Sequence, residues 1–300
     1  MHPTVSAVIP TYNRAKMLVE AVESALQQTH PPYEIVVIDD GSTDDTGKVM
    51  ARYAGKVRYI RQKNSGPSAA RNHGFRLATG DFIALLDSDD LWVKDRLERQ
   101  LAALALRPEL DVLFGLEAKF TAEQQFDPCD IKDTQVLASL KAVNYLIPNP
   151  LALLLRENFI PTSSALFRRS CLAKVGPIDE SLKQAEDYDF WLRFALHGCQ
   201  FGFINSTLCR RRMHEGNLVN QWLNRTITTA EVLSRYRDRS PEHRASVSLR
   251  LSDLYYDLGS HLLYRRDFTP ALHYLRQANP SGRTRLVWAA KLGLARLLAH

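Results

Sequence analysis

The feature that most constrains this chain is a regular alternation of two patterns along its first third. Short segments rich in apolar residues, each of strand length, lie at residues 5–9, 34–38, 57–60 and 82–86. Segments with the apolar spacing of helices follow them at residues 15–28, 44–53, 66–78 and 94–106. This alternation predicts βαβ units and a mainly parallel sheet. Because the strands are apolar on both faces, we expect helices on both sides of that sheet.

The pattern weakens after residue 107 and changes character near Gly216. Before Gly216 we expect strands at residues 111–120, 163–167, 201–204 and 208–213, a helix at 186–197, and an irregular stretch at 121–162. Beyond it the chain has helical spacing and no strand pattern, and a single helix–turn–helix unit at 254–278 is too little for a solenoid. The sequence therefore predicts an α/β domain at residues 1–215 and an all-helical extension at 216–300.

Composition and charge narrow the class of protein. The 300 residues are 45% hydrophobic and 24% charged, which supports a sizeable core and excludes wholesale disorder. The net charge of +6 suits phosphate-bearing substrates or an anionic membrane, and without a recognition motif it predicts no nucleic acid partner. We see no secretory leader and no apolar run of ~20 residues, so we expect a cytoplasmic protein. Its scattered cysteines, which form no CxxC pair, are expected to be reduced thiols: Cys129, Cys171, Cys199 and Cys209.

Polar side chains follow three of the expected strands. The segments that follow these strands are Pro10-Thr11-Tyr12-Asn13, Asp39-Asp40-Gly41-Ser42 and Asp87-Ser88-Asp89-Asp90. In a parallel sheet these carboxyl ends lie at one edge, where such folds bind ligands. Carboxylates gathered at one edge repel each other unless a cation or a donor-rich ligand lies among them.

Asp87 and Asp89 are the sharpest part of this cluster. Both carboxylates of such an alternating pair can reach one divalent ion, and hard oxygen ligands suit Mg²⁺ or Mn²⁺. An isolated pair is weak evidence, since acidic residues after a strand also start helices. Its place after a buried strand, on the edge shared with Asp39 and Asp40, favours a metal site.

Other polar residues leave two interpretations open. Asp39 and Asp40 are expected either to form a turn before the next helix or to accept hydrogen bonds from a nucleobase, and spacing does not choose between these roles. Arg71, early in a helix, opposes the helix dipole and indicates either a nearby anion or a surface salt bridge. His214 follows three arginines, which suit a phosphate contact or a solvated basic strand.

Asp187 stands out in a second acidic segment, at residues 186–189. On a helix it shares a face with Phe190, Trp191 and Phe194, which is the apolar, inward face. A carboxylate there must be paired or must line a cavity, and partial burial raises its pKa toward that of a general base. The other interpretation is an acidic helix start favoured by the dipole.

In this order, the segments resemble the family 2 glycosyltransferases, an inverting group with the nucleotide-binding α/β fold called GT-A. The resemblance covers residues 5–214, and its ordered set of motifs is specific although each motif is weak alone. The matching segments are VSAVIPTYNR at residues 5–14, IVVIDDGSTD at 35–44, GPSAARN at 66–72, FIALLDSDD at 82–90 and EDYDFWLR at 186–193.

The resemblance implies a role for each candidate residue. The implied nucleotide-binding residues are Pro10, Thr11, Tyr12, Arg14, Asp39, Asp40, Arg71, Asp87 and Ser88. Asp87 and Asp89, with His214, are implied to hold Mn²⁺ or Mg²⁺ on the diphosphate, and Asp187 corresponds to the catalytic base. The implied reaction is a single displacement from a nucleotide-sugar, with UDP as the family's commonest carrier. The implied acceptor is a hydroxyl of a glycan or lipid-linked molecule in polysaccharide or glycoconjugate synthesis.

Two other functions compete with this interpretation, and the C-terminal residues suggest a further contact. A nucleotidyltransferase of related fold would show a glycine-rich basic loop after the first strand, which PTYNR is not. An inactive binding module would lack Asp87, Asp89 or Asp187, and all three are present. The basic and apolar C-terminal residues 283–300 suggest peripheral contact with the inner membrane face, although packing on the helical part explains them as well.

Overall fold

The computed structural model describes residues 3–121, 124, 131–214, 222–237, 241–280 and 284–299. The chain divides into two compact units. The first comprises Met1–Ser181 and Asp189–Glu215, and the second comprises Leu182–Tyr188 and Gly216–His300. Gly216 and Cys129 lie outside the described residues. The cysteines Cys171, Cys199 and Cys209 are buried free thiols.

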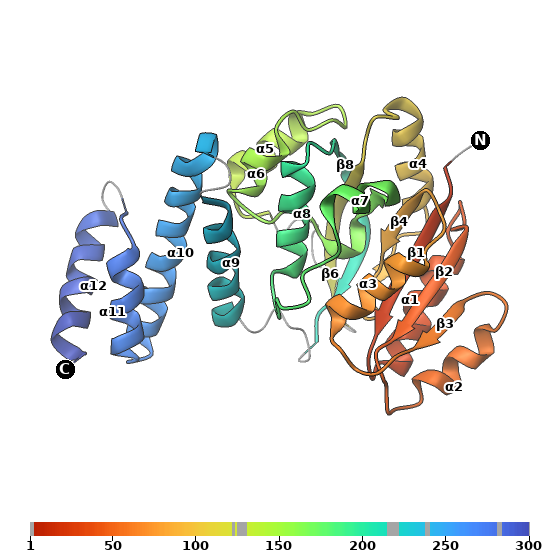
Figure 1. Cartoon of the computed structure of the whole chain (residues 1–300), viewed down its shortest axis with the longest axis horizontal. Coiled ribbons are helices and arrows are strands. Elements are labelled where there is room, and N and C mark those ends of the chain that lie inside the picture. The colour runs from red at the N-terminus through yellow and green to blue at the C-terminus, as the bar shows by residue number, and fades with distance from the viewer. Residues whose placement is uncertain are drawn as a thin grey trace. The chain divides into compact units, whose positions relative to one another are not determined.

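The first unit is built on an eight-stranded sheet with the order β3-β2-β1-β4-β7-β6-β8-β5 (Figure 1). The strands are β1 Val5–Thr11, β2 Glu34–Asp39, β3 Arg58–Arg61, β4 Phe82–Leu85, β5 Leu91–Trp92, β6 Val112–Phe120, β7 Leu166–Arg168 and β8 Phe201–Arg212. Strand β7 runs antiparallel to both β4 and β6, and β5 is antiparallel to β8. The remaining six strands are parallel to one another, so their carboxyl ends face the same edge. The mainly parallel sheet is as predicted.

Helices cover both faces of this sheet. The helices of the first unit are α1 Ala15–Leu26, α2 Thr46–Met50, α3 Pro67–Leu77, α4 Arg96–Leu106, α5 Thr134–Ala142, α6 Pro150–Leu154, α7 Leu172–Val175 and most of α8 Glu186–Leu196. On one face, Leu18 of α1 and Leu97 of α4 pack in one core with Ile9 of β1. On the other, Phe75 of α3 stacks on Phe190 of α8, with ring centroids 5.9 Å apart.

Helix α3 lies unusually close to the sheet. A Cβ atom at Gly74 would come within 2.4 Å of Cγ1 of Val8 in β1, which real side chains do not tolerate. Glycine therefore permits this approach, and α3 begins at the sheet edge where the strands end. This placement brings Arg71, one turn into α3, to the carboxyl ends of β1 and β4.

Three local predictions were wrong. The stretch 121–162, expected to be irregular, contains α5 and α6, whose first turns are capped by Asp133 and Asn149. Residues 122–123 and 125–130 of it lie outside the described part. The strand expected at 163–167 is a 3-10 turn, η2 (Thr162–Ser164), followed by the short β7. The two strands expected at 201–204 and 208–213 form the single strand β8, because it pairs with β6 along its length through a bulge.

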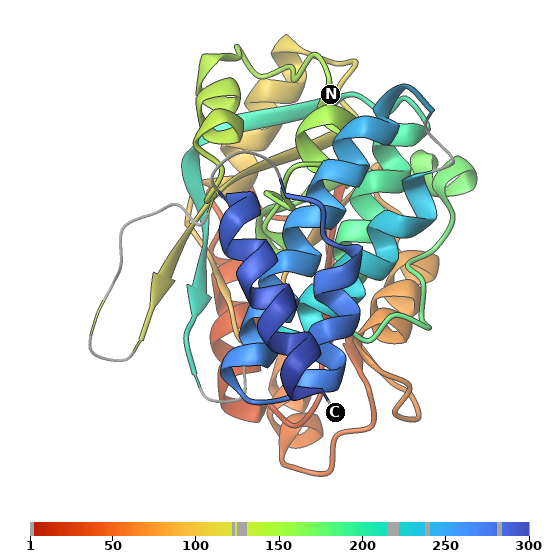
Figure 2. The same ribbon diagram turned by 90° about the vertical axis from the view of Figure 1, so that its left-hand side faces the viewer.

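The second unit is helical in the part that the structure describes. Its helices are α9 Trp222–Arg237, α10 Arg244–Tyr264, α11 Phe268–Gln277 and α12 Thr284–Leu298. Figure 2 shows α10, α11 and α12 in blue, side by side. Leu272 and Leu275 of α11 pack against Leu292 and Ala295 of α12. None of the described helices is long and apolar enough to cross a bilayer.

Candidate active site

The carboxyl ends of β1, β2 and β4 lie together at one edge of the sheet. Thr11 is the register partner of Asp39, and its carbonyl accepts a hydrogen bond from the N–H of Asp40 at 2.8 Å. The N–H of Leu86, just before Asp87, donates to the Val8 carbonyl at 3.2 Å. The three polar segments that the sequence placed after these strands are therefore neighbours in space.

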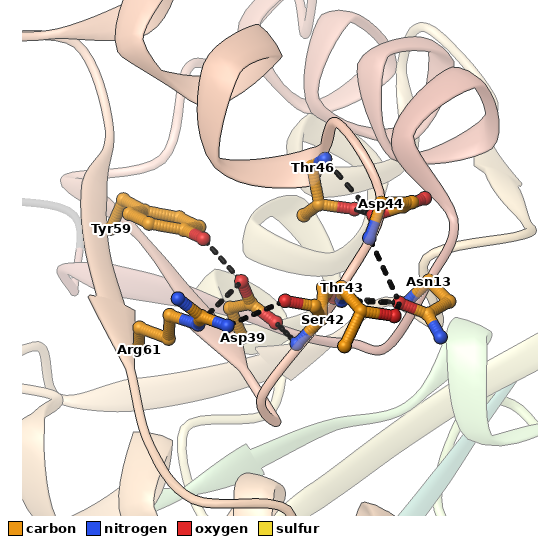
Figure 3. Close-up of polar contacts among 8 residues, drawn as sticks. All are labelled: Asn13, Asp39, Ser42, Thr43, Asp44, Thr46, Tyr59 and Arg61. Carbon is orange, nitrogen blue, oxygen red and sulfur yellow. Dashed lines mark hydrogen bonds and ion pairs between the residues drawn. The ribbon is translucent and has the colours of Figure 1, made fainter.

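Asp39 is 1% exposed and anchors the turn after β2. Its Oδ1 accepts a hydrogen bond from the N–H of Ser42 at 2.8 Å, and its Oδ2 accepts one from the Tyr59 hydroxyl (Figure 3). Burial, and then the hydrogen bond to the Asp39 carboxylate, raise the pKa of Tyr59 above its ordinary value. The Arg61 Nε lies 4.0 Å from the same oxygen. A buried carboxylate thus has donors on both oxygens.

The loops after β1 and β2 are joined through Asn13, which has a positive φ of 50°. Its Oδ1 accepts a hydrogen bond from the N–H of Thr43 at 2.7 Å, and its own N–H donates to the Ser42 hydroxyl at 2.9 Å (Figure 3). Asp44 then accepts from the N–H groups of Ala15 and Thr46 at 3.1 and 3.0 Å. The two loops therefore form one rigid rim.

Asp40 holds the segment that leads into α3. Its Oδ1 accepts hydrogen bonds from Gln62 Nε2 and from the N–H of Ser65, at 2.8 and 2.9 Å, and its Oδ2 accepts one from the N–H of Gly66 at 2.8 Å. Asp40 is 3% exposed. Asp39 thus has the turn-forming role that the sequence suggested, whereas Asp40 holds the segment before α3. The contact of either carboxylate with a nucleobase stays a prediction.

The segment after β4, which we call the acidic turn (residues 87–90), is paired with cations. Asp87 Oδ1 lies 2.6 Å from Nη2 of Arg71, and Asp89 forms an ion pair with Arg14. His214 Nε2 lies 3.0 Å from Asp89 Oδ2. Arg71 is only 7% exposed, whereas the Asp87 side chain is 28% exposed, so the ion pair is partly buried and not a surface salt bridge.

Two further residues of the acidic turn are buried. Ser88 is 3% exposed and Asp90 is 5% exposed. Asp90 accepts hydrogen bonds from the Ser163 hydroxyl at 2.6 Å and from the N–H of Arg212 at 3.1 Å. Burial, and then the charges of Asp89 and Asp87, raise the pKa of Asp90 well above its ordinary value. Sequence reasoning missed Ser163, and no local pattern marks a serine that acts 73 residues from its partner.

Residues of the β1 end differ in exposure. Pro10 is buried, whereas the Tyr12 side chain is 47% exposed. Thr11 is 3% exposed, and its Oγ1 has no hydrogen-bond partner among the described residues. A buried hydroxyl without a partner is costly unless a ligand or a water supplies one. The partnerless Thr11 hydroxyl therefore makes the β1 end a candidate ligand contact.

The acidic turn offers oxygen ligands of the kind that a hard divalent cation takes. Asp87 and Asp89 offer carboxylate oxygens, and each already lies beside a positive group, Arg71 or Arg14. The Asp87 side chain keeps 28% of its surface exposed, so a ligand can reach it. Oxygen donors that leave room for water and phosphate are those that Mg²⁺ and Mn²⁺ prefer.

The segment that contains Asp187 belongs to the second unit, and its part in the site stays a prediction. It is half-buried in the first turn of α8, and its Oδ1 accepts a hydrogen bond from the N–H of Tyr188 at 2.7 Å. The expected apolar face follows, with Phe190 and Trp191 fully buried. Asp189 is also buried and pairs with Arg193 at 2.8 Å, so it is no solvated helix-start acid.

Comparisons with known proteins show the family of this chain. Residues 6–176 match the family described as "Glycosyl transferase family 2". An uncharacterized glycosyltransferase of Rickettsia typhi, RT0329, is 31% identical over 222 residues, which are 74% of this chain and 68% of that protein.

Solved structures show the GT-A fold. The S. aureus TarS fragment 1–349 in complex with UDP-GlcNAc has a TM-score of 0.67 at 20% identity, covering 98% of this chain and 88% of the fragment. This chain covers 53% of the longer TarS structure. The mannosyltransferase PcManGT from Pyrobaculum calidifontis, in complex with GDP-Man and Mn²⁺, has a TM-score of 0.64 at 18% identity, covering 100% of this chain and 86% of that one. The predicted GT-A fold is confirmed.

Proposed function

Because the chain belongs to glycosyl transferase family 2, we propose that it transfers a sugar from a nucleoside-diphosphate sugar to an acceptor hydroxyl with inversion. In this proposal, residues 1–215 form the catalytic domain and residues 216–300 a helical extension. The expected nucleotide is UDP. The acceptor is a glycan or a lipid-linked molecule, in polysaccharide or glycoconjugate synthesis.

The nucleotide lies against the rim formed by the β1 and β2 ends. Pro10, Thr11, Tyr12 and Arg14 line this site with Asp39, Asp40, Arg71, Asp87 and Ser88. Support comes from the buried Thr11 hydroxyl, which lacks a partner among the described residues, and from the half-exposed Tyr12 ring beside it. Two fold relatives bind UDP-GlcNAc and GDP-Man. We assign base or ribose contact to Asp39 or Asp40.

Asp87 and Asp89 would hold Mn²⁺ or Mg²⁺, with His214 as a third group. A bound divalent cation supplies positive charge beside the departing diphosphate. PcManGT was solved with Mn²⁺, and its fold is the one found here. Arg71 and Arg14 contact the same two carboxylates, so protein side chains also supply positive charge there.

Asp187 acts as the general base. It takes the proton of the acceptor hydroxyl as that oxygen bonds to the anomeric carbon, and the bond from this carbon to the diphosphate breaks on the opposite face. Asp187 is half-buried at the start of an apolar helix face.

One observation carries the proposal. At the edge where the parallel strands end, Asp87 pairs with Arg71 and Asp89 pairs with Arg14. Thermal unfolding with UDP, GDP, dTDP or CMP, each with Mn²⁺ or with EDTA, tests it. A nucleotide at 100 times its dissociation constant should add about 2.7 kcal/mol to the free energy of unfolding. The proposal requires that one nucleotide stabilises the protein and that EDTA removes the effect; no such shift with any of the four refutes it.

We also propose that α12 lies on the inner membrane face near the acceptor. Its five large exposed apolar residues are Leu286, Val287, Leu294, Leu297 and Leu298, between 42% and 78% exposed. At 100° per residue they lie on one side of the helix, opposite the buried Leu292 and Ala295. Arg285 and Arg296 add positive charge to the same helix, which favours anionic headgroups.

A further inference from the structure

A serine far away in sequence holds both ends of the acidic turn. The Ser163 hydroxyl accepts a hydrogen bond from the N–H of Asp87 at 3.1 Å and donates one to Asp90 Oδ2 at 2.6 Å. Ser163 is 1% exposed, so bulk water does not compete for these bonds. We propose that Ser163, anchored by Arg96, is a positioning residue that sets the geometry of the acidic turn for donor binding. This role rests on the proposed function of that turn.

Two buried side chains hold the backbone of Ser163. Nη1 of Arg96 donates to the Ser163 carbonyl at 2.8 Å and to the Leu85 carbonyl at 3.1 Å. Nε1 of Trp92 donates to the same two carbonyls, at 3.1 and 3.2 Å. Nη2 of Arg96 reaches the Ala165 carbonyl at 2.8 Å. One planar guanidinium therefore joins the end of β4, two residues before Asp87, to the η2 turn.

The burial of Arg96 is costly and therefore informative. Its side chain is 0% exposed, and its acceptors are backbone carbonyls and the Gln100 side-chain amide at 3.1 Å. Burial lowers the pKa of Arg96 to about 9, which leaves it protonated at neutral pH. An apolar side chain would avoid the desolvation of a charge but would leave these converging carbonyls unpaired. A guanidinium satisfies them in a fixed, planar geometry.

The Ser163 hydroxyl connects this rigid backbone to the acidic turn. With the Asp87 amide and the Asp90 carboxylate both fastened to one oxygen, the residues between them have little freedom. Asp87 then meets Arg71, and Asp89 meets Arg14. Removal of the hydroxyl frees the Asp87 amide and takes from the buried Asp90 one of the two donors described above. The turn should loosen without disturbing the core below it.

Ser163→Ala tests this, with Ser164→Ala as a matched control. Ser164 is the next residue of η2, is 0% exposed, and bonds the carbonyls of Gly115 and Pro161 at 3.1 and 2.9 Å but not the acidic turn. In hydrogen–deuterium exchange of the free protein, residues 87–90 should exchange about tenfold faster in Ser163→Ala only, as the loss of one hydrogen bond implies. Unchanged exchange, or equal acceleration in both variants, overturns the proposal.

Binding of UDP with Mn²⁺ gives a second readout. Ser163→Ala should bind about tenfold more weakly, since loss of one hydrogen bond shifts affinity by that order, and Ser164→Ala should bind normally. Arg96→Lys, which keeps the charge but loses the planar donor set, should weaken binding in the same direction. Normal binding in Ser163→Ala overturns the positioning role. If the unaltered protein binds none of UDP, GDP, dTDP and CMP, the proposed function fails, while exchange still decides whether Ser163 orders the turn.

Discussion

Both units of this protein bury an apolar core, but they differ in how much charge they bury. In the α/β unit, charged residues such as Asp39, Asp89 and Arg96 are at most 7% exposed. In the described part of α9–α12, the buried polar side chains are only Thr226 and Ser252, whereas leucines of α12 lie exposed. Buried charge destabilises a fold unless every group is paired, and exposed apolar area destabilises it in water. The difference motivates the chemistry proposed for the first unit and the membrane contact proposed for the second.

The largest expected effect concerns the buried charges. Asp89→Asn should lower kcat/KM by about 10³-fold, because a metal contributes several kcal/mol of charge stabilisation and each 1.36 kcal/mol is tenfold in rate. UDP release from a UDP-sugar, with water as acceptor, measures this. Asp45→Asn serves as the control, since that exposed side chain pairs with Lys48 and lies outside the acidic turn. Full activity in Asp89→Asn would place the chemistry elsewhere.

Asp187 tests whether the chemistry is confined to the first unit. It belongs to the second unit, yet we propose that it acts in the reaction. Asp187→Asn should lower kcat by about 10²- to 10³-fold, as loss of a general base does. Affinity for UDP with Mn²⁺ should stay unchanged. The same UDP-release assay and a titration separate the two quantities, with Glu186→Gln as the neighbouring control. A normal kcat would remove Asp187 from the mechanism.

Glycine substitutions compare packing in the two units. Gly74→Ala should lower the free energy of unfolding by about 2 kcal/mol, because the new Cβ would lie 2.4 Å from Val8 Cγ1 in a close-packed layer. Gly293→Ala in α12 meets no atom within 4 Å and should stabilise its helix by up to about 1 kcal/mol. Urea unfolding measures both. Equal effects of the same sign would contradict the difference in packing.

The smallest expected effect tests the exposed apolar face. The double variant Leu294→Ser and Leu297→Ser should bind anionic phosphatidylglycerol vesicles about tenfold less, since two exposed leucines lose part of their apolar transfer energy. Leu249→Ser changes an equally exposed leucine of α10, which is 55% exposed, and should bind as the unaltered protein does. Cosedimentation decides, and identical recovery of all three proteins would exclude α12 as the membrane contact.

Local patterns predicted most of the fold. The alternation of β-branched segments with helical spacing suffices for a parallel sheet, and chain direction then places Thr11, Asp39 and Asp87 at one edge. Helices α5 and α6 were missed because their starts depend on single capping residues, Asp133 and Asn149, within a proline-containing stretch. Strand β8 was divided in two because its continuity depends on pairing with β6.

The sequence by itself determined the fold class, the gathering of acidic residues at one edge of the sheet, and the family resemblance. All three follow from order and spacing along the chain. Only the tertiary structure decided which groups hold the acidic turn. His214 meets Asp89 across 125 positions and Ser163 meets Asp87 across 76, so no local window contains both partners. Nor does any local pattern indicate that Arg96 is buried and not solvated. Hydrogen bonds and ion pairs form only at short distance, and only the folded chain brings these partners within 3.1 Å.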